Sequence, residues 1–242
     1  MIEIYKNNDS VKYNNFINNI DDPNIFINPD LINVYVDNYD VWWIKKNNTD
    51  ICVALILYKN NKIISKPISF LPYYGPKFSN TIEEYSNHKK LKIKLDATTA
   101  LLETLQINYN KIHFVCDTWT EDVRPYQWIN YNEENLEKFT IDINYTGIID
   151  LKKYSGVEDY FKSIRYVRRQ DLKKNKKLNC SISWSSNKDQ ILDLISLRNK
   201  TFKRQNQNVN SNENLLIENI TKKITETKKG ELLIIKDKDK SI

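Results

Sequence analysis

The densest group of side chains that could bind an anion is a basic run over residues 165–177, RYVRRQDLKKNKK. On one continuous helix, four of its basic residues are spaced by four, four and three positions and share a face: Arg165, Arg169, Lys173 and Lys176. Such a stripe could hold the phosphates of a nucleotide, a coenzyme or a tRNA. Arg168 adds a third arginine, a residue suited to two-point phosphate contacts. The alternative is a solvated helix face in a lysine-rich protein.

A second group lies in the aromatic loop 71–76, LPYYGP. Tyr73 and Tyr74 supply two phenols, and Gly75 together with the two prolines excludes a regular element. The loop follows a predicted sheet, so it could form one wall of a binding pocket. The alternative is an ordered apolar turn.

A third group, residues 201–205 (TFKRQ), lies where a predicted helix ends. Phe202 could act as an aromatic anchor, with Arg204 and Gln205 as hydrogen-bond donors. Basic residues are also favoured at any helix C-terminus, because they compensate the helix dipole. A plain helix end is therefore the alternative.

Common catalytic signatures are absent from the sequence. There is no GxSxG, HExxH, P-loop or GxGxxG, and only four glycines are present. We interpret His88 and His113 as structural, and Cys116, which precedes Asp117, as a small core thiol. Three cysteines without a CxxC pair suggest neither a disulfide framework nor a metal site. The sequence does not name a catalytic residue.

Length and composition indicate a folded chain. Its 242 residues suit one large domain or two modest ones, and 40% hydrophobic residues can form a core. The formal net charge of +6 favours an anionic partner only weakly. No signal pattern or apolar run of about 20 residues is present, so we predict no membrane span and a cytoplasmic location.

The elements that position these groups follow alternating helix and strand patterns, beginning with the first part of the chain. Asn-Asn pairs at 47–48 and 60–61 predict tight turns in an antiparallel meander. Leucines at helical spacing predict a long helix over 81–109. The other elements expected are a short helical pattern over 25–35, in which Pro29 suits a first turn, and strands over 41–44, 51–58, 62–66, 111–116, 139–143 and 145–151. A first domain should close near residue 145.

The rest of the chain continues with alternating elements. Ser155 and Glu158 form a capping box that predicts a helix to about residue 177. Further expectations are strands over 180–184 and 231–236 and helices over 187–203 and 212–227. Residues 237–240 look like a hairpin turn whose return strand is cut off at Ile242, so we expect the chain to stop in the middle of a fold.

In this order, six segments resemble the FemAB-like and related GNAT-superfamily N-acyltransferases, the relatives of the peptidoglycan bridge-forming aminoacyltransferases. The segments are 25–31 (IFINPDL), 42–44 (WWI), 71–78 (LPYYGPKF), 145–151 (YTGIIDL), the Arg165, Arg168 and Arg169 helix, and 201–205 (TFKRQ). Each is short, but together they span nearly the whole chain.

The resemblance implies an α/β fold of two tightly packed GNAT-like halves, each with a mixed, largely antiparallel sheet flanked by helices. Residues 1–144 would be the first half, on the acceptor side, and residues 145–242 the incomplete start of the second. The activity implied is transfer of an acyl or aminoacyl group from acetyl-CoA or an aminoacyl-tRNA to an amine. The acceptor would be a sugar, peptide or small molecule used in cell-envelope synthesis, and no cofactor would be bound permanently.

The sequence departs from the family by lacking the later strands and helix that form the donor site, and the glycine-containing pyrophosphate loop. We therefore expect an enzyme only if the second half is completed. Since the chemistry is attack of an amine on a thioester or ester, orientation and backbone donors can supply most of the acceleration. The missing catalytic dyad does not argue against it.

The same resemblance suggests roles for the candidate residues. Three arginines would bind phosphate of the donor or acceptor: Arg165, Arg168 and Arg169. Tyr73, Tyr74 and Gly75 would form the acceptor wall, Trp42 would add an apolar contact, and Arg204 with Gln205 would lie near the junction of the halves. Two alternatives stay open, a non-enzymatic RNA-binding module and a catalytically dead scaffold.

Overall fold

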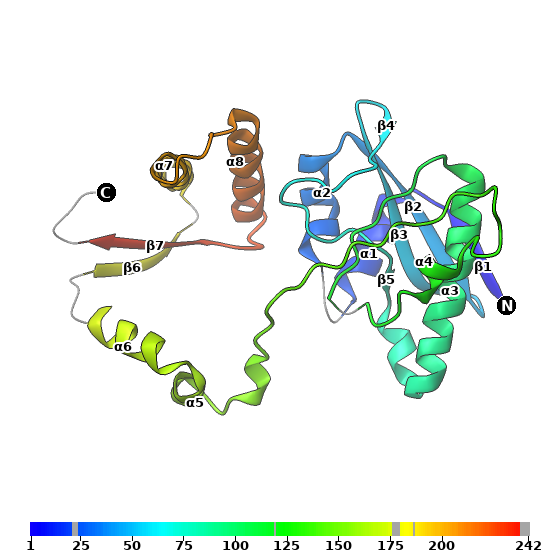
Figure 1. Cartoon of the computed structure of the whole chain (residues 1–242), viewed down its shortest axis with the longest axis horizontal. Coiled ribbons are helices and arrows are strands. Elements are labelled where there is room, and N and C mark those ends of the chain that lie inside the picture. Colours follow the sequence, from blue (N-terminus) through cyan, green and yellow to red (C-terminus); the bar gives the residue numbers. More distant parts are fainter. Residues whose placement is uncertain (21–23, 119, 176–179, 186, 238–242) are drawn as a thin grey trace.

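The computed structural model describes residues 1–20, 24–118, 120–175, 180–185 and 187–237, and its elements mix helices with antiparallel strands (Figure 1). The first part of the chain forms β1 (Ile2–Lys6), α1 (Ser10–Asn18), η1 (Ile25–Ile27), α2 (Pro29–Tyr35), β2 (Asn38–Lys46), β3 (Thr49–Lys59), β4 (Lys62–Ile63), β5 (Lys77–Phe78), η2 (Asn80–Glu84), α3 (Asn87–Asn108) and α4 (Arg124–Trp128). The second part forms η3 (Leu151–Lys153), α5 (Val157–Ser163), α6 (Tyr166–Asn175), β6 (Cys180–Ser185), α7 (Lys188–Arg204), α8 (Ser211–Glu226) and β7 (Leu232–Asp237).

The larger sheet is an antiparallel meander with the order β1-β2-β3-β4, and β5 pairs with the first part of β3. Both predicted Asn-Asn turns are confirmed. Asn47 and Asn48 have φ values of 48° and 63°, and Asn60 and Asn61 have values of 51° and 56°. Asparagine tolerates this left-handed backbone better than most residues, so it takes the place of glycine in these turns.

Helices cover both faces of this sheet. Val41 and Trp43 of β2 pack into the cluster that includes α1 and α2, whereas Trp42 and Ile44 point to the opposite face, which α3 covers. Burial on both faces explains why β3 reads as a nearly unbroken apolar run instead of an alternating one.

The predicted long helix exists but is shorter than expected. It begins at Asn87, after the separate 3-10 turn η2, and its residues Ala97, Leu101 and Leu105 are completely buried against the sheet. Their spacing of four positions places them on one face of the helix, as the leucine pattern indicated.

Several predicted strands are not formed, and several observed elements were not predicted, namely β1, α1, β5, α4 and η3. Residues 111–116, 139–143 and 145–151 join no ladder among the described residues, since β propensity alone does not provide a partner edge. The segment around Val115 instead accepts backbone hydrogen bonds from Tyr74 and Gly75 at 2.9 and 3.0 Å. β1 and α1 lie at the N-terminus, where Asp9 caps α1 by accepting from the amides of Val11 and Lys12.

The predicted helix over 155–177 is two helices, α5 and α6. Ile164 between them has an extended backbone with ψ of 145°, which ends α5. The expected capping box is also not formed, because Ser155 bonds to Asp159 in place of Glu158. Lys176 and Lys177 lie outside the described residues.

The remaining elements agree closely with their predicted ranges. β6 and β7 form an antiparallel pair, and α7 and α8, which connect them in the chain, lie on one side of it (Figure 1). The Arg198 guanidinium joins α7 to α8 by donating to Asn214 Oδ1 at 2.5 Å and to Glu213 Oε2 at 2.7 Å. Of the turn predicted at 237–240, residues 238–240 lie outside the described part.

Helix α8 connects the second part of the chain to the first. Its residue Ile220 is 8% exposed and belongs to the same core cluster as α1, α2 and the sheet. Lys229, which follows α8, lies 3.8 Å from a carboxylate oxygen of Asp30 in α2. The two parts are therefore joined by an apolar helix contact with a charged contact at its edge.

Helices differ in whether they are long and apolar enough to cross a bilayer. Within the described ranges, none combines the length and the apolar character that a membrane crossing requires.

Candidate functional site

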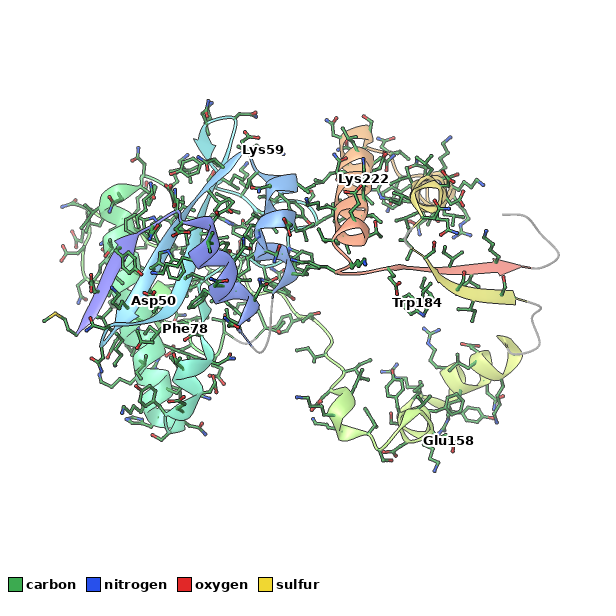
Figure 2. All side chains as sticks on the ribbon, turned by 180° about the vertical axis from the view of Figure 1, so that it is seen from behind. Asp50, Lys59, Phe78, Glu158, Trp184 and Lys222 are labelled. Carbon is green, nitrogen blue, oxygen red and sulfur yellow. The ribbon has the colours of Figure 1, made fainter. Side chains whose placement is uncertain are left out.

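A cleft of about 610 Å³ opens in the first part of the chain, between β5, η2, the beginning of α3 and residues 117–126. Phe78 of β5 marks this end of the sheet in Figure 2. The lining combines apolar side chains with lysines and carboxylates, which is the mixture expected of a site for a polar ligand.

An ion pair lies within this cleft. The pairing of β5 with β3 places Lys77 opposite Val53, and the Lys77 side chain is only 10% exposed. Its Nζ atom donates to Asp117 Oδ2 at 2.9 Å, and Thr120 donates to Oδ1 of the same carboxylate at 3.3 Å. A carboxylate and an ammonium are therefore held together in a partly desolvated position.

Two further ion pairs lie at the rim. Lys90 lies 2.7 Å from Glu83, and the Glu83 carboxylate raises the pKa of the Lys90 ammonium. Lys94, one turn later in α3, lies 3.4 Å from Glu121. Because these lysines and carboxylates surround one opening, the cleft presents charges of both signs and could bind a ligand that carries both.

Cys116 lies behind this cleft and takes part in packing. Burial raises the pKa of its thiol, so the thiol is protonated at neutral pH, and its Sγ atom lies 3.4 Å from the Tyr126 hydroxyl. Burial likewise raises the pKa of Tyr126 well above its usual value. A protonated thiol is a poor nucleophile, in agreement with the interpretation of Cys116 as a core residue.

Two of the side chains predicted at the acceptor site, Trp42 and the wall residue Tyr74, lie in the core and need correction. Trp42 is 6% exposed and donates from Nε1 to the Tyr109 hydroxyl at 2.7 Å. Tyr74 is 1% exposed, and its hydroxyl lies 2.6 Å from His113 Nδ1. Both side chains pack in the apolar interior and do not line a pocket.

The two remaining wall residues, Tyr73 and Gly75, have backbone and packing roles. Tyr73 is half-buried, and its carbonyl oxygen accepts from Asn24 Nδ2 at 3.1 Å. Gly75 lies so close to Cys116 that a Cβ atom would come within 3.0 Å of Sγ. The loop therefore passes the cleft with its backbone packed on residues 115–116, and Lys77, two positions later, enters the cleft.

Ile164, where the predicted helix breaks, lies before all three predicted arginines and does not separate them. Arg165 stays one turn before Arg169, whose amide donates to the Arg165 carbonyl at 3.1 Å. Arg165 precedes α6 and lines a shallow hollow of about 510 Å³ beside Tyr160. Arg168 is 75% exposed and lies 3.6 Å from Asp171. The Arg169 guanidinium donates to the Lys162 carbonyl at 2.8 Å.

Arg204 and Gln205 are exposed at the end of α7. Gln205 is the C-cap residue, and its amide donates to the Phe202 carbonyl at 3.0 Å. Phe202 packs under the guanidinium of Arg198, whose centre is 4.3 Å from the ring centroid. This arrangement is that of an ordinary helix end, the alternative given above.

The structure thus brings Lys77 and Asp117 together, and it does not bring the predicted residues into one site. Lys77 and Asp117 are separated by 40 positions in the chain. Each had a local signal, since Lys77 belongs to the segment 71–78 and Asp117 follows an apolar stretch. Their pairing depends on how β5 and the segment after α3 meet.

Over the described ranges, no group of three or more His, Cys, Asp and Glu side chains is arranged to hold a metal ion. Comparison with protein-family models, curated proteins and solved structures found no match. The function must therefore be argued from the residues of this chain.

Proposed function

We propose that this chain takes part in N-acyl or aminoacyl transfer, and that the cleft around Lys77 and Asp117 binds the amine-bearing acceptor. The observation that supports this function best is the 2.9 Å pair of a lysine and a carboxylate inside a cleft of about 610 Å³. The GNAT-like character of the fold, with the chain supplying the acceptor-side half, is part of the same proposal.

The reaction requires the acceptor amine in its neutral form, because an ammonium has no lone pair with which to attack. An ammonium held at Asp117 would give its proton to the carboxylate, and the neutral nitrogen would attack the carbonyl carbon of the donor. The new C–N bond would replace the C–S bond of a thioester or the C–O bond of an aminoacyl ester. The attacking nitrogen gives up a second proton to become the amide. One of the two protons passes to the leaving thiolate or alkoxide, and the other is released to water. The charge of Lys77 favours the oxyanion formed between these steps.

The rim supports an acceptor that carries charges of both signs. Glu83 and Glu121 could hold a second ammonium, and Lys90 and Lys94 could hold a carboxylate or phosphate by exchanging their present partners. Sugars with an amine and a phosphate, and peptides with a free amine and a carboxylate, both belong to this class.

The experiment uses the full chain with two donors in parallel, acetyl-CoA and an aminoacyl-tRNA. The acceptors are glucosamine 6-phosphate and a short peptide that ends in lysine. We expect one combination to yield an amide product by mass spectrometry. Asp117→Asn should lower the rate by about 100-fold, the usual contribution of a general base.

A matched control is a second partly buried Lys–Asp pair, Lys12 and Asp50, which lies 2.7 Å apart and outside the cleft. Asp50→Asn should reduce stability to a similar degree but leave transfer unchanged. Absence of transfer in every combination, or equal transfer by the Asp117→Asn variant, would contradict the proposed function.

A second candidate function is nucleic-acid binding by α6 and the residues before it. Tyr166 is 65% exposed, and the Arg169 guanidinium lies 6.0 Å from the centroid of its ring. An arginine beside an exposed aromatic ring, with the exposed Arg165 and Arg168 near it in the chain, suits contact with phosphates and a base. The same surface would serve a tRNA that carries an acyl donor.

The test for this second function is titration with a tRNA and with single-stranded RNA at two salt concentrations. Binding should weaken steeply as salt rises, because phosphate contacts release counterions. Replacing Arg165, Arg168 and Arg169 by alanine should weaken RNA binding further, in a variant that remains folded. If the triple variant bound RNA as tightly as the native chain, this surface would not be the nucleic-acid binding site.

A further inference from the structure

One face of the β6–β7 pair is apolar and exposed. Ile182 lies opposite Ile235, and Trp184 lies opposite Leu233, so the four side chains project from the same face. Their exposed fractions are 68% for Ile182, 54% for Ile235, 65% for Trp184 and 51% for Leu233. On the other face, Leu232 is half-buried.

The figures show which elements lie on each side of this pair. Helices α7 and α8 lie on one side, and α5 and α6 lie on the other (Figure 1). Figure 2 shows the Trp184 side chain on the side of α5 and α6, where Glu158 marks α5. The apolar face is therefore directed toward α5 and α6.

The segment α5–α6 carries exposed apolar side chains of its own. Val157 of α5 is 84% exposed, and Tyr166 and Val167 at the start of α6 are 65% and 67% exposed. Two exposed apolar surfaces on elements that neighbour each other are unfavourable in water, and burial of both removes the cost.

The chain permits these surfaces to meet. Only five positions separate Asn175, the last residue of α6, from Cys180, the first of β6, which span at most about 17 Å. Ten residues of helix are about 15 Å long, comparable to the six residues of β6 at about 20 Å. On the other side, α5 follows residues 142–153, which are exposed throughout and can adjust without breaking core contacts.

We propose that α5 and α6 form a flap that closes over Ile182, Trp184, Leu233 and Ile235. The described arrangement is its open state, and the closed state buries Val157 and Val167 against this face. The covering element is a neighbouring segment of the same chain, and this inference does not depend on acyl transfer.

The experiment measures how well acrylamide quenches the fluorescence of Trp184. The contribution of this residue is the difference between each protein and its counterpart that also carries Trp184→Phe. We expect Trp184 to be shielded in the native chain and readily quenched in a Val157→Asp/Val167→Asp variant. Each aspartate should lower the closing equilibrium constant by about tenfold, because it would place a charge against apolar side chains.

The control is Val11→Asp, since Val11 on α1 is 67% exposed, similar to Val167, and belongs to another part of the chain. It should leave the quenching of Trp184 unchanged. Equal, free quenching in the native chain and the double variant would overturn the flap. Shielding that persists in the double variant and grows with protein concentration would also overturn it, and would assign the face to a second copy of the chain.

Discussion

The Tyr109 hydroxyl donates a hydrogen bond of 2.7 Å to Oδ2 of Asp40, and this bond joins the end of α3 to strand β2. Tyr58 donates to the same oxygen at 2.6 Å, and Lys6 lies 2.7 Å from Oδ1. Although burial acts to raise the pKa of Asp40, the hydrogen bonds from these groups and from Asn8 lower it overall. The carboxylate is 6% exposed and remains ionised because its oxygens are satisfied.

Replacing this carboxylate should destabilise the fold. We expect Asp40→Asn to reduce the free energy of unfolding by about 3 kcal/mol. The network would lose the negative charge of Asp40, and the Lys6 ammonium would keep its positive charge without that partner. In the native chain, the stability due to Asp40 is present above the unfolded pKa of 3.8 and is lost as pH falls through the lower folded pKa. Urea unfolding from pH 7 to pH 3 measures both effects, with exposed Asp193→Asn as the control. Equal stability of the two variants would contradict the prediction.

The pair of Tyr74 and His113 predicts a second pH dependence. Burial lowers the pKa of His113 below its usual 6.5, while Asp142 opposes the shift. The unfolded chain therefore binds more protons below pH 6.5, and folded-state stability should fall between pH 6.5 and pH 5. Tyr74→Phe should cost about 1 kcal/mol at pH 8 and make this pH dependence shallower, since protonation no longer competes with the Tyr74 hydrogen bond. Urea midpoints at pH 5, 6 and 8 measure it.

For this pair the control is the other histidine. His88 is exposed at the start of α3, so His88→Gln should leave the slope between pH 5 and pH 6.5 as it is in the native chain. If the pH dependence of stability vanished in His88→Gln and persisted in His113→Gln, His88 would be its cause and the prediction would be wrong.

Gly75 should be intolerant of a methyl group for reasons of space. Its added Cβ would lie 3.0 Å from Cys116 Sγ and 3.1 Å from Cys116 Cα. Gly75→Ala should therefore cost about 2 kcal/mol in a thermal or urea unfolding experiment, as overpacking does elsewhere. Gly147 has no atom within 4 Å of such a Cβ, so Gly147→Ala is a matched control that should change stability little. Comparable losses in both variants would refute the packing explanation.

The contact of α8 with the first part of the chain can be tested at Ile220. Ile220→Ala should destabilise the chain by about 3 kcal/mol, because it leaves a cavity in the core shared with α2. Leu215 on the same helix is 58% exposed, and Leu215→Ala should cost much less. Hydrogen exchange should show faster exchange in α2 only for the Ile220 variant. Unchanged exchange there would mean that α8 does not support α2.

Local patterns predicted much of the fold. The Asn47–Asn48 turn, the buried helix face with Leu101 and the strand that begins at Cys180 depend on interactions within a few residues, which a short stretch of sequence specifies. The break at Ile164 was missed because the apolar stripe was assumed to continue through it. The unformed strand over 111–116 was missed because a ladder needs a partner that local sequence does not reveal.

The sequence by itself determined the antiparallel meander, its Asn-Asn turns and most of the helices, because backbone preference and apolar spacing act over one or two turns of chain. Only the tertiary structure decided that Tyr74 is a core residue and that Lys77 meets Asp117 in a cleft. Those outcomes depend on contacts between residues 39 and 40 positions apart, whose geometry is set by packing both faces of one sheet.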